Sequence, residues 1–150
     1  MKVWASLYGM VWLVVLELLV AIDPRPPSWV LYVHIALGIG IIALAGYNFV
    51  RVRATTAPGR VKRTVRATFG LAILMAFLGI LLWANIGNGG FTLLGYNFWD
   101  AVHVFHVLNA LAILAQAAAT ATAFDMWEEK EFERPTAPGV IPAPPTPGTQ

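Results

Sequence analysis

Four long apolar stretches, separated by short segments rich in proline, glycine or charge, dominate the pattern of hydrophobic and polar positions. They cover residues 3–22, 29–50, 67–86 and 99–124. Each approaches or exceeds the roughly 20 residues that an α-helix needs to cross the hydrocarbon core of a bilayer. The segments at 23–28 and 87–90 contain the proline and glycine residues that end helices. The pattern therefore predicts an all-α integral membrane protein folded as a four-helix bundle.

Composition agrees with this prediction. The chain is 58% hydrophobic and only 12% charged, with a mean hydropathy of +0.67, whereas soluble domains are about 25% charged. The absence of cysteine excludes disulfides, thiolate metal sites and iron–sulfur clusters. The pI of about 9.2 comes mostly from one predicted loop between apolar stretches, so we expect no nucleic-acid partner. We expect a multi-pass protein of the cell membrane, with the lipid bilayer as its first partner.

The basic residues predict the orientation of the bundle. If the four stretches alternate in direction, nine of the ten Lys and Arg residues lie at the same end of the bundle, and only Arg25 lies at the other. The nine are Lys2, Arg51, Arg53, Arg60, Lys62, Arg63, Arg66, Lys130 and Arg134. Six of these lie between the second and third stretches, where we expect a loop. Because cytoplasmic segments carry an excess of Lys and Arg, both termini are predicted to be cytoplasmic.

The chain divides into three parts. Residues 1–124 form the transmembrane domain, 125–134 a charged helical stub at the membrane surface, and 135–150 a Pro-rich tail. Pro-rich segments favour extended conformations. We interpret the tail either as a strap that contacts a protein partner in a membrane complex or as a disordered end.

Few ionisable side chains fall well inside the apolar stretches, and the candidates are Glu17, His34, His103 and His106. Such residues are costly within a membrane and are functional candidates by default. At 1.5 Å per residue, all four lie roughly 6–10 Å below the non-basic end of their helices. Because helix direction alternates, they converge on one layer in the outer leaflet. This convergence predicts a cofactor or metal site in that layer.

One haem b is the chemistry that we favour for this layer. We expect His34 and His106 to be its axial ligands, because imidazoles from two helices hold haem iron on opposite faces. Gly38 and Ala110, one turn deeper on the same helix faces, would leave room for the broad ring. His103 is a substitute for His106, or else a contact for a propionate or a quinone. Glu17 would orient a ligand or accept a proton.

With these residues the chain resembles the small four-helix transmembrane b-type cytochromes, which pass electrons between quinones and other redox partners. The resemblance rests on the helix count, the His-x-x-x-Gly sequence from His34 to Gly38, and the paired His103 and His106. It implies an electron carrier, or a subunit of a respiratory or other redox complex, rather than a stand-alone enzyme. Two-haem members need four axial histidines, and this chain has three, so one haem is expected.

Other interpretations remain open from the sequence. The protein is alternatively a non-catalytic accessory subunit that stabilises a larger membrane complex, with its histidines serving only interhelical hydrogen bonds. A third hypothesis is a non-haem metal site formed by the three histidines and Glu17. A transmembrane histidine can also hold the magnesium of a chlorophyll-type pigment. We interpret Asn48, Asn85, Asn109 and Gln116 as interhelical contacts rather than ligands.

Overall fold

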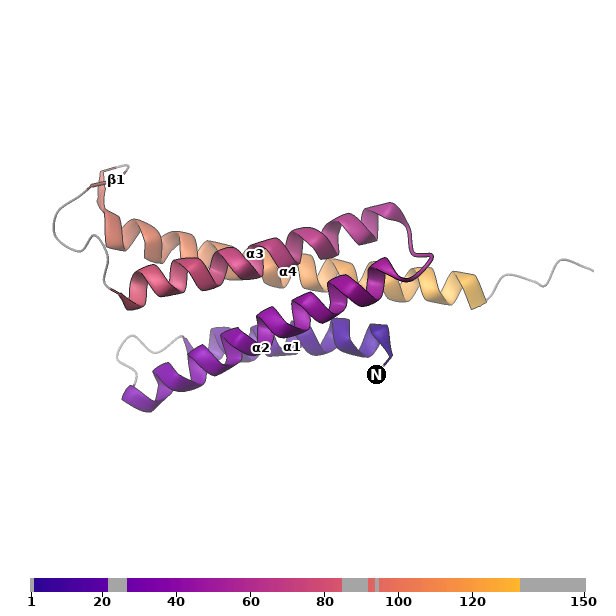
Figure 1. The fold of residues 1–150 in the computed structure, drawn as a ribbon, viewed down its shortest axis with the longest axis horizontal. Helices are drawn as coiled ribbons and strands as arrows, with labels where there is room; N and C mark the ends of the chain where they lie inside the picture. Colours follow the sequence, from indigo (N-terminus) through magenta and orange to yellow (C-terminus); the bar gives the residue numbers. More distant parts are fainter. Residues whose placement is uncertain (1, 22–26, 85–91, 94, 133–150) are drawn as a thin grey trace, which may run out of the picture.

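The computed structural model describes residues 2–21, 27–84, 92–93 and 95–132. Within these residues it contains four long helices and one two-stranded hairpin (Figure 1). The elements are α1 (Val3–Val20), α2 (Ser28–Arg53), α3 (Gly59–Trp83), β1 (Thr92–Leu93), β2 (Tyr96–Asn97) and α4 (Phe98–Phe132). Each helix is long and apolar enough to cross a membrane. The predicted all-α architecture of four such helices is confirmed.

The four helices form a closed ring of contacts. α1 packs against α2 and α4, and α3 packs against the same two helices. α1 and α3 therefore occupy one diagonal of the bundle, and α2 and α4 the other. The start of α1, the α2–α3 connection and the end of α4 lie at one end of the bundle (Figure 1). We call it the basic end, and the opposite end, which carries β1 and β2, the hairpin end.

Packing is densest in the middle of the bundle and at the basic end. One cluster of buried side chains, which includes Leu7, Val65 and Phe124, lies at the basic end. A second cluster in the middle includes Met10 and Ile113. Towards the hairpin end, no residue is buried in 27–40 or in 73–84. Many large apolar side chains face outwards, which is compatible with contact to lipid.

The connection between α2 and α3 is shorter than the sequence indicated. α2 continues to Arg53 and α3 already begins at Gly59, so only residues 54–58 separate them. The six basic residues that we expected in a loop lie instead on the ends of two helices. The apolar pattern marks where a helix leaves the membrane, but Arg and Lys are good helix formers and let the helix continue.

α4 also exceeds its predicted span. It runs without a break to Phe132, so most of the charged stub expected at 125–134 is a continuation of the fourth helix. Several sequence-based expectations lie outside the described residues: those for Arg25, Asn85, residues 87–90, Arg134 and the Pro-rich tail.

The hairpin was not predicted from the sequence. Thr92 pairs with Asn97 and Leu93 with Tyr96 in an antiparallel ladder. Gly95 has a φ of 83°, a conformation that glycine adopts without steric cost. The hairpin leads directly into α4 and thereby positions the first turn of that helix.

Candidate functional site

Three ionisable side chains from three helices meet towards the hairpin end. Nδ1 of His34 on α2 lies 2.8 Å from Oε1 of Glu17 on α1. The ring of His34 also faces that of His106 on α4, with centroids 6.1 Å apart and planes inclined by 47°. Of the four side chains predicted to converge, Glu17, His34 and His106 therefore meet, whereas His103 does not join them.

The positions of these residues along their helices explain why they meet. Glu17 lies one turn before the end of α1, whereas His34 and His106 lie about two turns after the start of α2 and α4. Because successive helices run in opposite directions, these positions fall at a similar level. α2 and α4 lie on one diagonal, so the two imidazoles face each other across the bundle.

α3 completes this layer with a glycine. A Cβ atom added at Gly79 would lie 3.4 Å from Cε1 of His106, so the backbone of α3 closely approaches this imidazole. Each of the four helices thus contributes one residue to a single layer, which we call the histidine layer: Glu17, His34, Gly79 and His106. Sequence reasoning missed Gly79, although its depth below the end of α3 is similar to that of the histidines.

Two polar atoms of the histidine layer are buried without a hydrogen-bond partner among the described residues. They are Oε2 of Glu17 and Nδ1 of His106. Glu17 as a whole is only 9% exposed, while the His34 side chain is 31% exposed. A buried polar atom without a partner costs about 1–3 kcal/mol. The layer therefore contains an acceptor oxygen and a ring nitrogen whose bonding capacity is unused.

His103 lies apart from this pair of imidazoles. It is exposed, and its ring contacts that of Trp99, with centroids 5.6 Å apart. The Trp99 indole N–H donates to the carbonyl of Leu82 at 3.5 Å, which joins the start of α4 to the end of α3. His103 precedes His106 by three residues along α4, so it lies about one turn closer to the hairpin end.

The two small residues expected to flank the ligands occupy different surroundings. A Cβ at Gly38 would lie 4.0 Å from Oε1 of Glu17, so this glycine adjoins the carboxylate rather than the imidazole pair. Ala110 is buried in α4, with 7% exposure. Among the described residues, no three His, Cys, Asp or Glu side chains are grouped to hold a metal ion.

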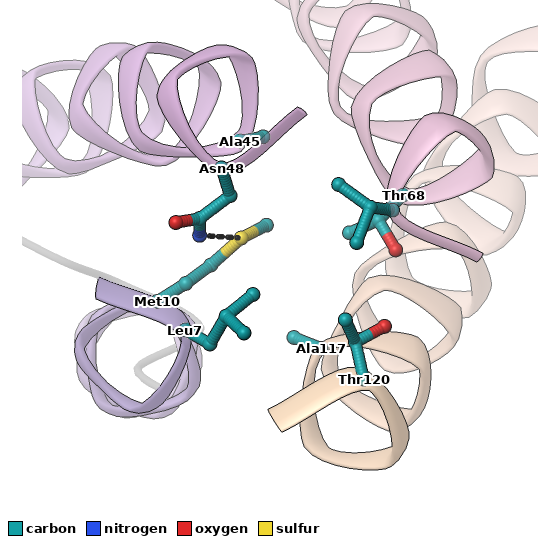
Figure 2. Close-up of a pocket in the computed structure, with 8 residues that line it drawn as sticks. Leu7, Met10, Ala45, Asn48, Thr68, Ala117 and Thr120 are labelled. Atoms are coloured by element: carbon teal, nitrogen blue, oxygen red, sulfur yellow. Dashed lines mark hydrogen bonds between the residues drawn. The ribbon is translucent and has the colours of Figure 1, made fainter. Parts of the chain in front are cut away.

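A second polar layer lies closer to the basic end, around a cavity of about 10 Å³. Figure 2 shows Met10 and Asn48 on one side of it, and Thr68 and Thr120 on the other. The Asn48 amide N–H donates to the carbonyl of Ser6 at 3.3 Å and to the sulfur of Met10 at 3.8 Å. The cavity has room for about one water molecule at most, so this layer does not form a ligand site.

The other interhelical polar contacts also match the sequence interpretation. The Asn109 amide donates to the carbonyl of Leu71 at 2.9 Å, and the Thr68 hydroxyl lies 3.2 Å from Oε1 of Gln116. Both contacts join α3 to α4. Asn48, Asn109 and Gln116 are therefore confirmed as residues that link helices.

Comparison with known proteins gives this chain no relative. No protein family matches it, and no significant match occurs among curated proteins or solved structures.

Proposed function

We propose that this chain is a membrane electron-transfer protein that carries one haem b, with His34 and His106 as its axial ligands. The observation that carries the proposal is the facing pair of imidazoles, contributed by helices on opposite sides of the bundle. Haem would supply one-electron chemistry, cycling between ferric and ferrous iron. The residues of the chain would bind it, orient it and exclude water.

The separation of the imidazoles supports shared ligation of one metal. A metal–nitrogen bond to imidazole is about 2.0 Å, and a ring nitrogen lies about 1.1 Å from its centroid, so two opposed ligands have centroids about 6 Å apart. The observed separation is 6.1 Å. The unpartnered Nδ1 of His106 adds to this support, because a ring nitrogen left without a hydrogen bond is free to bind a metal.

The loose packing near the hairpin end also fits a large apolar cofactor. No residue is buried in 27–40 of α2 or in 73–84 of α3, so these two helices contribute no fully buried side chain beside the histidine layer. Gly79 presents no side chain towards His106. His106 supports the proposal better than His103 does, because His103 is exposed and its ring contacts that of Trp99.

The orientation of the protein follows from its charge. An excess of Lys and Arg is typical of cytoplasmic segments, so the charge supports a multi-pass cell-membrane protein whose basic end and both termini are in the cytoplasm. The histidine layer then lies near the outer face. We propose that His103, exposed beside Trp99, contacts a haem propionate or a quinone. The protein would serve a respiratory or other redox complex, in which the tail at 135–150 contacts a protein partner.

A second candidate function is supported by the hydrogen bond between Glu17 and His34. A carboxylate and an imidazole that satisfy each other also stabilise a helix pair without any cofactor. The protein would then be an accessory subunit whose histidines are structural. This candidate leaves the unpartnered nitrogen of His106 without a role, and we therefore place it second.

A dithionite-minus-air difference spectrum of the purified protein, with a pyridine haemochrome assay, tests the proposal. We expect a b-type α band and about one haem per chain. His34→Ala should abolish the band, whereas the matched control His103→Ala should retain it. A colourless protein from cells with ample haem would overturn the proposal and leave the accessory role. Loss of haem in His103→Ala, with retention in His106→Ala, would reassign the second ligand.

A further inference from the structure

We infer that Glu17 is a positioning residue that strengthens His34 as a ligand and makes the two axial imidazoles unequal. This inference rests on the proposed haem. It adds a role for α1, which contributes no ligand of its own, and it assigns the control of the haem potential to one hydrogen bond.

The geometry fixes which nitrogen of His34 remains free. Nδ1 of His34 lies 2.8 Å from Oε1 of Glu17. The carboxylate can only accept this hydrogen bond, so Nδ1 carries the proton and donates it. In a neutral imidazole the other nitrogen, Nε2, is then the one available to bind iron. A carboxylate partner in this position fixes the tautomer and the orientation of a ligating ring and raises its basicity.

The surroundings of Glu17 leave few competitors for its hydrogen bond to His34. The residue is 9% exposed, so water competes little for the carboxylate. Its second oxygen has no hydrogen-bond partner among the described residues. A Cβ at Gly38 would lie 4.0 Å from Oε1, so the lack of a side chain there leaves space around the carboxylate. His34 is therefore the one donor, in the described part of the chain, that this carboxylate accepts from.

His106 has no comparable support. No carboxylate pairs with its ring among the described residues. If the unpartnered Nδ1 binds iron, Nε2 has no acceptor of the kind that Glu17 offers to His34. The neighbouring backbone at Gly79 restricts the ring sterically and adds no basicity. One ligand is therefore held and polarised by a carboxylate, and the other is held by packing alone.

The difference between the two ligands predicts how the reduction potential of the haem changes when Glu17 is replaced. A more basic axial imidazole stabilises ferric iron relative to ferrous iron, so the hydrogen bond to Glu17 lowers the reduction potential. Removing it should raise the potential. In Glu17→Leu we expect the ratio of ferrous to ferric haem, at a fixed applied potential, to rise about tenfold, which is ~59 mV for a one-electron couple.

Potentiometric titration of the haem-loaded full chain tests this expectation. Glu17→Gln keeps an acceptor oxygen, so its potential should lie between those of the wild type and Glu17→Leu. The matched control is Asn48→Leu, which removes the hydrogen bonds from Asn48 on α2 to Ser6 and Met10 on α1 without touching His34. Its potential should equal that of the wild type. If Glu17→Leu fails to take up haem, the potential of Glu17→Gln is the test. A value above that of the wild type supports the inference, and an unchanged value overturns it.

Ligand deletion gives a second readout. We expect His106→Ala to retain haem on His34 in a five-coordinate, CO-binding form, and His34→Ala to lose it. The opposite pattern would overturn the inference. Unchanged potentials in both Glu17 variants would overturn it as well, while leaving the haem proposal intact. A colourless wild-type protein would overturn both.

Discussion

At the scale of single residues, two buried asparagines differ in how fully their hydrogen-bonding capacity is used. The Asn109 amide donates to the carbonyl of Leu71 at 2.9 Å. Asn48 donates over the longer distances of 3.3 Å and 3.8 Å, and its Oδ1 is buried without a partner among the described residues. An unsatisfied polar atom offsets the gain from a modest hydrogen bond. The two residues should therefore contribute unequally to stability.

Replacement of each asparagine by leucine tests this difference. Asn109→Leu should lower the free energy of unfolding by about 0.6 kcal/mol, the average for interhelical hydrogen bonds in membranes, and by at most about 1.7 kcal/mol. Asn48→Leu should change it by less than about 0.5 kcal/mol, because it also removes an unsatisfied oxygen. SDS-induced unfolding in mixed micelles measures both. A larger loss in Asn48→Leu than in Asn109→Leu would contradict the prediction.

The sequence predicted part of the histidine layer and missed the rest for a definite reason. Depth follows from the 1.5 Å rise per residue, which was enough to bring Glu17, His34 and His106 together. Depth does not give the direction in which a side chain points around its helix. His103 and His106 are about 60° apart around α4, and only the packing shows that His103 turns to Trp99. Gly79 has no functional group that could have identified it.

At the scale of helices, a glycine lies at a close contact between α2 and α3. A Cβ added at Gly46 would lie 3.3 Å from Cε2 of Phe69. This ring cannot easily withdraw, since it stacks on Phe49 with centroids 5.7 Å apart. Gly70 on α3 is the opposite case, because a Cβ there would meet no atom within 4 Å.

Gly46→Leu should therefore destabilise the bundle, while Gly70→Leu should not. Overpacking at Gly46 is expected to lower the free energy of unfolding by about 1–3 kcal/mol. The control substitution adds the same side chain to an open helix surface and should have an effect within about 0.5 kcal/mol. The same micellar unfolding assay applies. Equal effects of the two substitutions would show that α2 and α3 are not closely packed at Gly46.

Helix number was predictable from the sequence, but helix ends were not. A stretch of about 20 apolar residues has few alternatives to a membrane-spanning helix, and all four such stretches were found. The start of α3 at Gly59 and the end of α4 at Phe132 lie outside the apolar stretches. In these polar segments, helix propensity and the continuity of the backbone decide where the helix begins or ends. The hydropathy pattern does not mark that position.

At the scale of the whole molecule, the two ends of the bundle differ in charge. The basic end carries Lys and Arg on the ends of α2 and α3, whereas the hairpin end carries few charges among the described residues. α4 has 35 residues, so it is about 52 Å long and exceeds the roughly 30 Å hydrocarbon core. Its last turns, which bear Asp125, Glu128 and Glu129, would extend into the aqueous phase.

Single-cysteine labelling tests which side each end faces. The chain has no cysteine of its own, so each introduced thiol reports on one position. Thr92→Cys, in the exposed hairpin, should react with a membrane-impermeant maleimide in intact cells. Thr56→Cys, exposed between α2 and α3, should react only after permeabilisation. The reverse pattern would invert the proposed orientation and place the histidine layer near the cytoplasmic face.

The sparse packing of α2 near the hairpin end has a consequence for the environment in which the protein works. The imidazole pair connects α2 to α4, two helices that make no close backbone contact within the described residues. Membrane helices adjust their tilt when the hydrocarbon thickness changes. A tilt of α2 would move His34 relative to His106, because little packing holds residues 27–40 in place. The reduction potential of the proposed haem would then vary with the thickness of the bilayer.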